Sequence, residues 1–225
     1  MKWKLCSLLL GASLSAVAGG EGPESAATET LHPDQQPLAR TVVYDCNGFE
    51  FVTRLGPGEM ALWLPQRYLV LSQVRSASGA KYQEGDVVFW SKGDEAMLQV
   101  GDVEYQECRL QPERAPWADA RRRGVDFRAV GNEPGWHLEI QDGRQLLYVG
   151  DYGEQRVSTP DPGVQVAGQS RSYRARTEAA ELSVDILETP CFDTMSGEAF
   201  PSSVTVTVNG RQLHGCGRDL EGLSD

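Results

Sequence analysis

The sequence has few of the residues, and none of the motifs, on which common catalytic and cofactor sites depend. Only three histidines occur, His32, His137 and His214, and their spacing matches no metal site. There is no G-x-S-x-G motif, no phosphate-binding P-loop and no G-x-G-x-x-G. Adjacent acidic residues such as Asp94 and Glu95 are expected on opposite faces of a strand, which argues against a glycosidase pair. The sequence thus argues against an enzyme and predicts neither a cofactor nor a bound metal.

Long apolar runs are also scarce, and the clearest one covers residues 5–17 near the N-terminus. Lys2 and Lys4 precede this run, and Ala16-Val17-Ala18 closes it as a small-x-small motif. This pattern predicts a secretory signal peptide over residues 1–18 that is cleaved near Ala18. Cys6 opens the apolar run instead of following it, so it does not match a lipobox. We therefore expect a soluble protein of the periplasm, without membrane insertion.

Basic residues are in the minority. The 21 lysines and arginines stand against 32 aspartates and glutamates, which gives a formal net charge of −11. An acidic exported protein is a poor ligand for nucleic acid or for an anionic membrane surface. The same charge favours a basic protein partner, although acidity can also serve solubility alone. The sequence is compatible with a homodimer as well.

Removal of the signal peptide leaves four cysteines, Cys46, Cys108, Cys191 and Cys216. They form no C-x-x-C motif, so a redox-active pair and a zinc ribbon are both disfavoured. Four cysteines allow three pairings. If each β-rich unit holds one pair, the favoured disulfides are Cys46–Cys108 and Cys191–Cys216.

A change in composition near residue 40 separates a predicted flexible leader, residues 19–39, from a region of short strands and tight turns. Asn47-Gly48 lies between two apolar runs and predicts a type I′ hairpin turn. The strands expected here cover residues 42–46, 49–53, 60–64, 68–74, 81–82, 87–90, 96–100 and 103–110. Eight short antiparallel strands within residues 40–110 predict a small closed β-barrel, an arrangement that leaves no free sheet edge.

A second β-rich region is expected after a linker. Residues 111–124 are charged, contain two prolines and lack alternation, which predicts a linker with room for a helical turn. Residues 125–225 then contain hairpin patterns around Asp142-Gly143 and Asn209-Gly210, and Leu182, Val184 and Ile186 alternate as in a half-buried strand. The predicted fold class is therefore all-β: an eight-stranded antiparallel barrel followed by a second small antiparallel β domain.

The segment of residues 78–93, SGAKYQEGDVVFWSKG, is the strongest candidate for a binding site. Ser78-Gly79 predicts a turn whose backbone can approach another surface closely, and Lys92-Gly93 places an ammonium group at a second turn. In a purely structural interpretation, Ser78-Gly79 is a common turn and Lys92 an ordinary exposed charge. Tyr82 and Trp90 are then plausible core aromatics.

The cysteine-framed region from residue 44 to residue 110 resembles the bacterial inhibitors of c-type lysozyme. The resemblance rests on Tyr44-Asp45-Cys46, on the run Ser78-Gly79-Ala80-Lys81-Tyr82, on the run from Phe89 through Ser91-Lys92-Gly93 to Ala96, and on Tyr105-x-x-Cys108. It implies a barrel that inserts a loop into the lysozyme cleft, with the hydroxyl of Ser78 and the ammonium of Lys92 on the catalytic carboxyls. Tyr82 is then expected to shape the loop. Gly79, Lys81, Ser91 and Gly93 complete the implied lysozyme-binding set, with Ser91 at a position where the family often has threonine.

The second region resembles an uncharacterised domain of exported bacterial envelope proteins, through its segments 131–136 and 191–216. Gly131–Trp136 is interpreted either as a ligand loop or as a turn anchored to the core by its tryptophan. The leading hypothesis is a protein inhibitor of c-type lysozyme that protects peptidoglycan. The alternative is a non-inhibitory module that binds peptidoglycan or an outer-membrane ligand.

Overall fold

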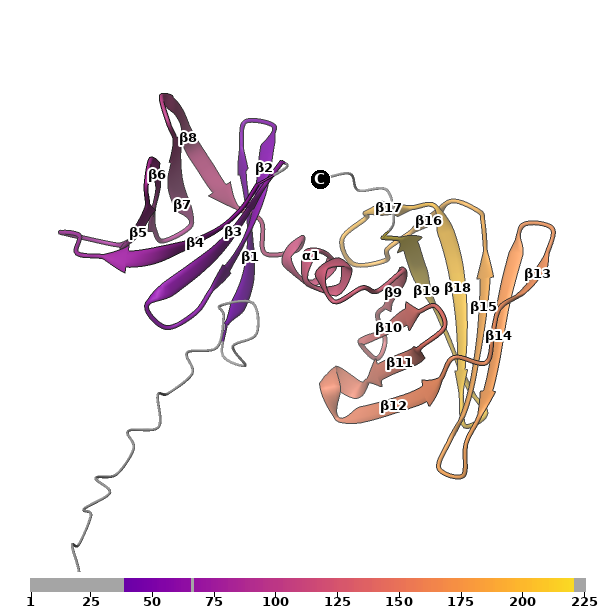
Figure 1. Cartoon of the computed structure of the whole chain (residues 1–225). Helices are drawn as coiled ribbons and strands as arrows, with labels where there is room; N and C mark the ends of the chain where they lie inside the picture. Colours follow the sequence, from indigo (N-terminus) through magenta and orange to yellow (C-terminus); the bar gives the residue numbers. More distant parts are fainter. Residues whose placement is uncertain (1–38, 66, 221–225) are drawn as a thin grey trace, which may run out of the picture. The chain divides into compact units, whose positions relative to one another are not determined.

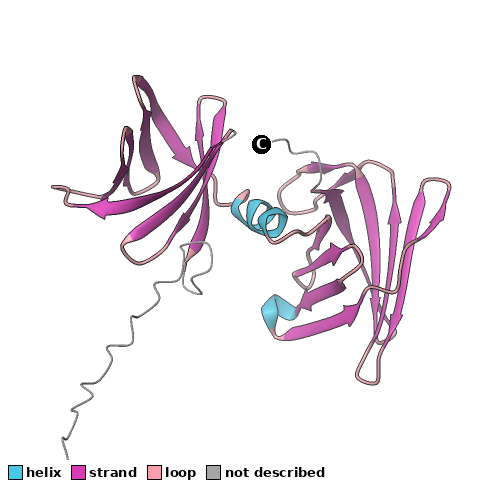
Figure 2. Cartoon of the chain, in the orientation of Figure 1, coloured by secondary structure: helices cyan, strands magenta, loops and turns pink. Residues whose placement is uncertain are grey.

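The computed structural model describes residues 39–65 and 67–220, and strands make up most of this part of the chain (Figures 1 and 2). The predicted signal peptide, and the predicted leader up to residue 38, lie outside the described residues. The first eight strands are β1 (Arg40–Cys46), β2 (Phe49–Leu55), β3 (Glu59–Leu64), β4 (Arg67–Val74), β5 (Ala80–Glu84), β6 (Val87–Lys92), β7 (Glu95–Val100) and β8 (Val103–Leu110).

These eight strands form a closed antiparallel barrel in sequence order, so the predicted eight-stranded barrel is confirmed. Each strand pairs with the next, and β1 also pairs with β8 through the registers Tyr44↔Leu110 and Asp45↔Arg109. Asn47 and Gly48 both have positive φ, 55° and 99°, as a type I′ hairpin turn requires. Local turn chemistry therefore fixes the first hairpin, and closure removes the exposed edges that would invite aggregation.

Alternation along the strands fills the barrel interior. The inward side chains that are essentially inaccessible to solvent include Phe51, Met60, Leu62, Leu71, Val87, Phe89 and Leu98. The Tyr44 ring lies 5.4 Å from that of Phe89 and 5.7 Å from that of Phe51, so aromatic packing links three strands. A disulfide joins Cys46 on β1 to Cys108 on β8, across the pair of strands that closes the barrel.

A short helix, α1 (Ala115–Arg122), occupies the segment for which the sequence predicts a linker. Pro116 lies in its first turn, where the missing N–H costs no helical hydrogen bond. Asp119 of the helix accepts hydrogen bonds from Thr41 (2.7 Å) and Arg54 (3.1 Å), which belong to β1 and β2. The segment thus contains a short helix, and its Asp119 side chain is bound by residues of the barrel strands.

The remaining strands are β9 (Phe127–Gly131), β10 (Trp136–Gln141), β11 (Gln145–Gly150), β12 (Gln155–Pro160), β13 (Gln165–Ala167), β14 (Ser170–Arg176), β15 (Glu181–Leu187), β16 (Cys191–Phe192), β17 (Ala199–Phe200), β18 (Ser202–Val208) and β19 (Arg211–Asp219), with the 3₁₀ turn η1 (Asp151–Gly153) after β11. Nine of them form one antiparallel sheet in the order β12-β11-β10-β9-β19-β18-β15-β14-β13. β16 and β17 form a separate two-stranded sheet. The predicted all-β class is thus confirmed for both regions.

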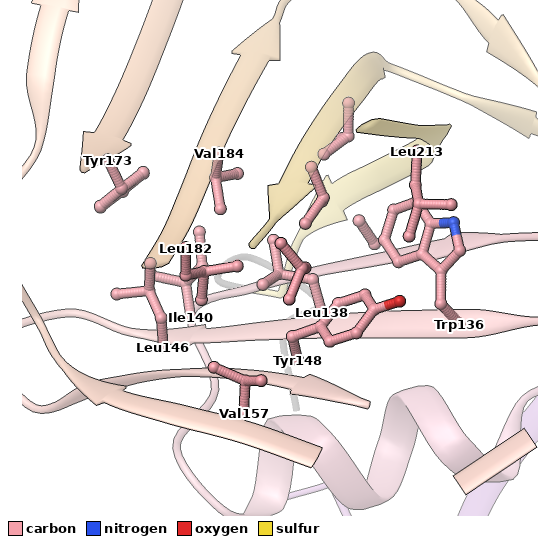
Figure 3. Close-up of a cluster of buried hydrophobic side chains, with 14 of the residues drawn as sticks. Trp136, Leu138, Ile140, Leu146, Tyr148, Val157, Tyr173, Leu182, Val184 and Leu213 are labelled. Carbon is pink, nitrogen blue, oxygen red and sulfur yellow. The ribbon is translucent and has the colours of Figure 1, made fainter. Parts of the chain in front are cut away.

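The nine-stranded sheet curls around its own hydrophobic core (Figure 3). Its fully buried members include Phe127, Ala129, Leu138, Ile140, Leu146, Tyr148, Leu182, Val184, Ile186 and Val206. Leu182, Val184 and Ile186 of β15 all face this core, as their alternation predicts. A second disulfide joins Cys191 of β16 to Cys216 of β19. Within residues 39–65 and 67–220, no helix is long and apolar enough to cross a membrane.

Candidate functional site

The turn that carries Ser78 lies between β4 and β5 and is held by two side-chain hydrogen bonds. Ser76 Oγ donates to the Gly79 carbonyl oxygen at 3.0 Å, within the turn itself. Trp90 Nε1 donates to the Ser78 carbonyl oxygen at 2.8 Å, from strand β6. Ser78 and Gly79 are both exposed. The Ser78 side chain is therefore exposed to solvent, while the carbonyl oxygens of Ser78 and Gly79 are both held by hydrogen bonds.

Gly79 allows this turn to lie directly on strand β6. Its φ is +69°, and an added Cβ would lie 2.1 Å from the Ser91 carbonyl oxygen and 3.2 Å from Lys92 Cβ. The first distance is far below any real contact, so this position accepts glycine alone without a shift of the backbone. The close approach brings the Ser78 turn beside Ser91 and Lys92, two further residues of the binding set that the family resemblance implies.

Strand β6 divides its residues between the two faces of the barrel wall. Val87 and Phe89 are buried, and Ser91 on the same face is partly buried, whereas Trp90 and Lys92 are exposed. The Ser91 hydroxyl neighbours the buried phenol of Tyr44. Burial raises the pKa of Tyr44, and the neighbouring Ser91 hydroxyl opposes that rise. Ser91 therefore joins the site to the barrel interior.

Lys92 ends β6 and is exposed, with Glu95 as its partner in the β6–β7 register. Glu95 forms an ion pair of 2.5 Å with Arg109 on the other side, so its charge is shared with that arginine. Among the described residues, no ion pair is formed by Lys92 within 4.0 Å. Gly93 follows with φ +61° and supplies the left-handed turn that leads into β7. The ammonium group is thus left available to a partner.

Two aromatic residues of the candidate segment have different positions. Tyr82 belongs to the barrel core, is 6% exposed and lies 6.3 Å from the Phe89 ring, and burial raises its pKa. Trp90 is 40% exposed on the outer face, opposite Lys81 in the β5–β6 register. The interpretation of Trp90 as a core residue is therefore wrong. Val87–Trp90 is a continuous apolar run, and such a run does not reveal which of its residues point outward.

The residues that share this outer rim are therefore Ser78, Lys81, Trp90 and Lys92, supported from within by Tyr82 and Ser91. They offer a hydroxyl, two ammonium groups and an indole that already makes a structural hydrogen bond. No group of three or more potential metal-binding side chains occurs in the described part of the chain. The arrangement is suited to binding acidic or hydrogen-bonding groups of another molecule.

Comparison with known sequences places the same stretch in one family. The sequence model described as membrane-bound lysozyme-inhibitor of c-type lysozyme matches residues 44–107. Proteins named membrane-bound lysozyme inhibitor of C-type lysozyme match from Yersinia enterocolitica, with 37% identity over 33% of this chain and 67% of theirs, and from Pseudomonas aeruginosa, with 36% identity over 44% of this chain and 86% of theirs. The chain belongs to this family of lysozyme inhibitors.

A third relative of the same name, from Escherichia coli, is 38% identical over 33% of this chain and 72% of its own length. No solved structure matches the chain. The matched residues 44–107 run from within β1 into β8, so the inhibitor family corresponds to the barrel. The nine-stranded sheet lies beyond the family match.

In the nine-stranded sheet, Trp136 at the start of β10 is 5% exposed and its ring centroid lies 6.2 Å from that of Tyr148. This position agrees with a tryptophan that anchors the Gly131–Trp136 turn to the core. His137, the next residue, is partly buried in β10, and burial, followed by the nearby Arg128, lowers its pKa to about 4.

Proposed function

We propose that the chain inhibits a c-type lysozyme by inserting the β4–β5 turn and the β6–β7 turn into the active-site cleft. The observation that carries this proposal is the packing of Gly79 against Ser91 and Lys92, which brings the turn of the exposed Ser78 next to the strand end of the exposed Lys92 in a member of the inhibitor family. The relatives are named as inhibitors of this enzyme class, and the family match over residues 44–107 covers both turns.

The chemistry of the two side chains complements a lysozyme cleft. Lysozymes of this type work with one carboxyl kept protonated and a second one ionised. The Ser78 hydroxyl is both donor and acceptor, so it can donate to the ionised carboxylate and accept from the protonated one. The Lys92 ammonium adds a charge-assisted hydrogen bond to the ionised group. Neither side chain contains a glycosidic bond, so the active site is occupied and no bond is cleaved.

Rigidity and charge support the same mechanism. The bonds from Ser76 and Trp90 hold the Ser78 turn in place before binding, which reduces the entropy lost on association. The net charge of −11 attracts a basic partner from a distance, and this attraction weakens as salt shortens the Debye length to ~8 Å at physiological ionic strength. On this proposal the protein acts in the periplasm and protects peptidoglycan from an incoming hydrolase.

The test is a titration of a c-type lysozyme with the full chain, with muramidase activity measured on a suspension of bacterial cell walls. Complete loss of activity near a 1:1 ratio is expected, with a muramidase of an unrelated structural class as the control that should stay active. Unchanged lysozyme activity at a large molar excess of the chain would contradict the proposal. Binding of the chain to cell walls without any loss of activity would instead support the alternative of a non-inhibitory envelope-binding module.

A further inference from the structure

Two loops of the nine-stranded region, far apart in the sequence, are fixed against each other. Asn132, in the turn between β9 and β10, donates from Nδ2 to Asp193 Oδ2 at 2.9 Å and to Thr194 Oγ1 at 3.0 Å. Asp193 also accepts hydrogen bonds from the backbone N–H groups of Met195 (3.0 Å) and Ser196 (2.7 Å). The disulfide Cys191–Cys216 holds the same loop to β19. These contacts form a rigid frame, and none of the residues in it belongs to the set proposed to bind lysozyme.

A hollow of about 240 Å³ lies within this frame. Its polar lining comes from Asn132, Glu133, Thr194, Gln212 and His214. The apolar part of the lining is Trp136 and Leu213, which lie beside each other at one end of the core cluster in Figure 3. His214 is oriented by a contact of 3.2 Å between its Nδ1 and the Thr205 hydroxyl. The hollow therefore lies where the hydrophobic core reaches the surface.

Unusual backbone conformations occur at one lining residue of the hollow and in the η1 turn next to the β9–β10 loop. Glu133 has φ +32°, and the consecutive residues Asp151 and Tyr152 have φ +47° and +55°, in the left-handed region that non-glycine residues seldom adopt. Such residues concentrate at ligand sites, where the surrounding structure maintains the strain. Tyr152 N–H donates to the Gly135 carbonyl oxygen at 3.3 Å, and a Cβ at Gly135 would lie 3.1 Å from Tyr152 Cε1. The Tyr152 ring is thus held against the loop that lines the hollow, yet it is 88% exposed.

We propose that this hollow, together with the Tyr152 ring, binds a neutral saccharide. None of the described residues that line it is lysine or arginine, and Glu133 brings a carboxylate, so an anionic ligand is disfavoured. Amide, hydroxyl, imidazole and carboxylate groups together donate to and accept from several hydroxyl or acetamido groups. An exposed tyrosine offers a flat apolar surface with a polar tip, which suits the C–H face of a sugar ring.

The dimensions restrict the ligand further. Pockets for drug-sized molecules usually measure ~300–1,000 Å³, so a hollow of about 240 Å³ accommodates a single ring. The Tyr152 ring beside the loop then contacts the neighbouring ring of an oligosaccharide. A free sugar and the glycan strand of peptidoglycan share this chemistry, and the experiment below separates them.

The experiment uses the full chain, with N-acetylglucosamine, glucose and N-acetylglucosamine oligosaccharides added separately and the Trp136 indole and Asn132 amide resonances followed by NMR. Saturable shifts of these resonances with at least one sugar are expected. Glu133→Gln and Tyr152→Asn should each weaken binding by about tenfold, which corresponds to the loss of one good polar or stacking contact. Asparagine is chosen at position 152 because it tolerates positive φ. Val166→Thr, on the edge strand β13 four strands from β19, is the matched control and should bind as the wild type does.

A second arm measures co-sedimentation of the same variants with purified peptidoglycan sacculi. Retention of the wild type but not of Tyr152→Asn assigns the glycan strand as a ligand, whereas sugar binding without retention assigns free saccharide. Absence of binding to every sugar and to sacculi, or equal binding by all variants, would overturn the proposal. Lysozyme inhibition should be unchanged in Glu133→Gln and Tyr152→Asn, so the outcome is independent of the barrel's proposed role.

Discussion

The indole N–H of Trp90 donates a hydrogen bond of 2.8 Å to the carbonyl oxygen of Ser78, which ties an exposed turn to the outer face of strand β6. The residue proposed to enter the lysozyme cleft is therefore positioned by another residue that is itself exposed on the rim. Trp90 has two roles available, since its ring can touch the partner while its nitrogen holds the turn.

The first prediction concerns this bond. Trp90→Phe keeps an aromatic ring on the rim and removes the donor, so inhibition should weaken by about 3–10-fold, which corresponds to roughly 0.5–1.5 kcal/mol. Measurement of inhibition constants with unchanged far-UV circular dichroism checks this. Trp63→Phe, on strand β3 of the same barrel, is the control and should inhibit as the wild type does. Equal inhibition constants for Trp90→Phe and the wild type would show that the bond does not position the turn.

The second prediction concerns the close approach of Gly79 to β6. Gly79→Ala places a Cβ 2.1 Å from the Ser91 carbonyl oxygen and must displace the turn, so inhibition should fall by more than about tenfold. Gly85→Ala is a matched control because Gly85 also has positive φ (+55°) but has open space around its Cβ position. Gly85→Ala should lose only roughly 1–2 kcal/mol of stability, which is the cost of a non-glycine residue in the left-handed region. It should inhibit lysozyme as the wild type does. Similar inhibition by both variants would contradict the prediction.

The third prediction concerns stability against pH. Burial, with Arg128 as the next cause, lowers the pKa of His137 to about 4, so the folded protein keeps this imidazole neutral. The unfolded chain takes up the proton near pH ~6.5, before the folded protein does. The free energy of unfolding should therefore fall as the pH drops from about 6.5 to about 4.

In His137→Gln, this part of the pH dependence should disappear, a difference of about 1–2 kcal/mol once partial solvent screening is allowed for. Urea unfolding at several pH values measures it, and subtraction of the variant curve from the wild-type curve removes the shared titration of the carboxylates. Parallel curves for the two proteins across this range would contradict the lowered pKa.

The fourth prediction concerns the independence of the barrel. The barrel has its own core, its own disulfide and both proposed contact residues, so a fragment of residues 39–124 should fold and inhibit lysozyme as the full chain does. A fragment of residues 39–110 should still inhibit but should be less stable by about 1–3 kcal/mol, because Thr41 and Arg54 lose their bonds to Asp119. Loss of inhibition in both fragments would assign part of the inhibitory surface to the nine-stranded region.

The barrel could be predicted from the sequence because its signals are local. Asn47-Gly48 sets a hairpin turn by its backbone conformation, and short strands that follow one another in sequence pair with their neighbours. Whether Trp90 lies on the inner or the outer face of the barrel could not be predicted in the same way. Phe89 and Trp90 are both apolar, and the difference between them arises only when the barrel closes around Phe89.

The second region was less predictable for related reasons. Strand β14 carries Arg174 and Arg176 on one face and so resembles a polar segment, yet Tyr173 and Ala175 on its other face are buried. The pairing of β19 with β9 joins strands that lie far apart in the sequence, and no local pattern specifies it. The hollow near Asn132 could not be predicted from the sequence either, because Thr194 and His214 reach the β9–β10 turn only through long-range packing.

The most direct test of the proposed inhibition is the inhibition constant of Ser78→Ala and of Lys92→Ala against a c-type lysozyme. Both residues are exposed, so both variants should keep the wild-type circular dichroism. Lys92→Ala should weaken inhibition more, by about 2–5 kcal/mol for a desolvated charge pair, and Ser78→Ala by about 1–3 kcal/mol, mainly through faster dissociation. Arg67→Ala removes a charge at the start of β4, at the opposite end of that strand from the Ser78 turn, and should leave the dissociation rate unchanged. Wild-type inhibition constants in both Ser78→Ala and Lys92→Ala would contradict the proposed contact with the catalytic carboxyls.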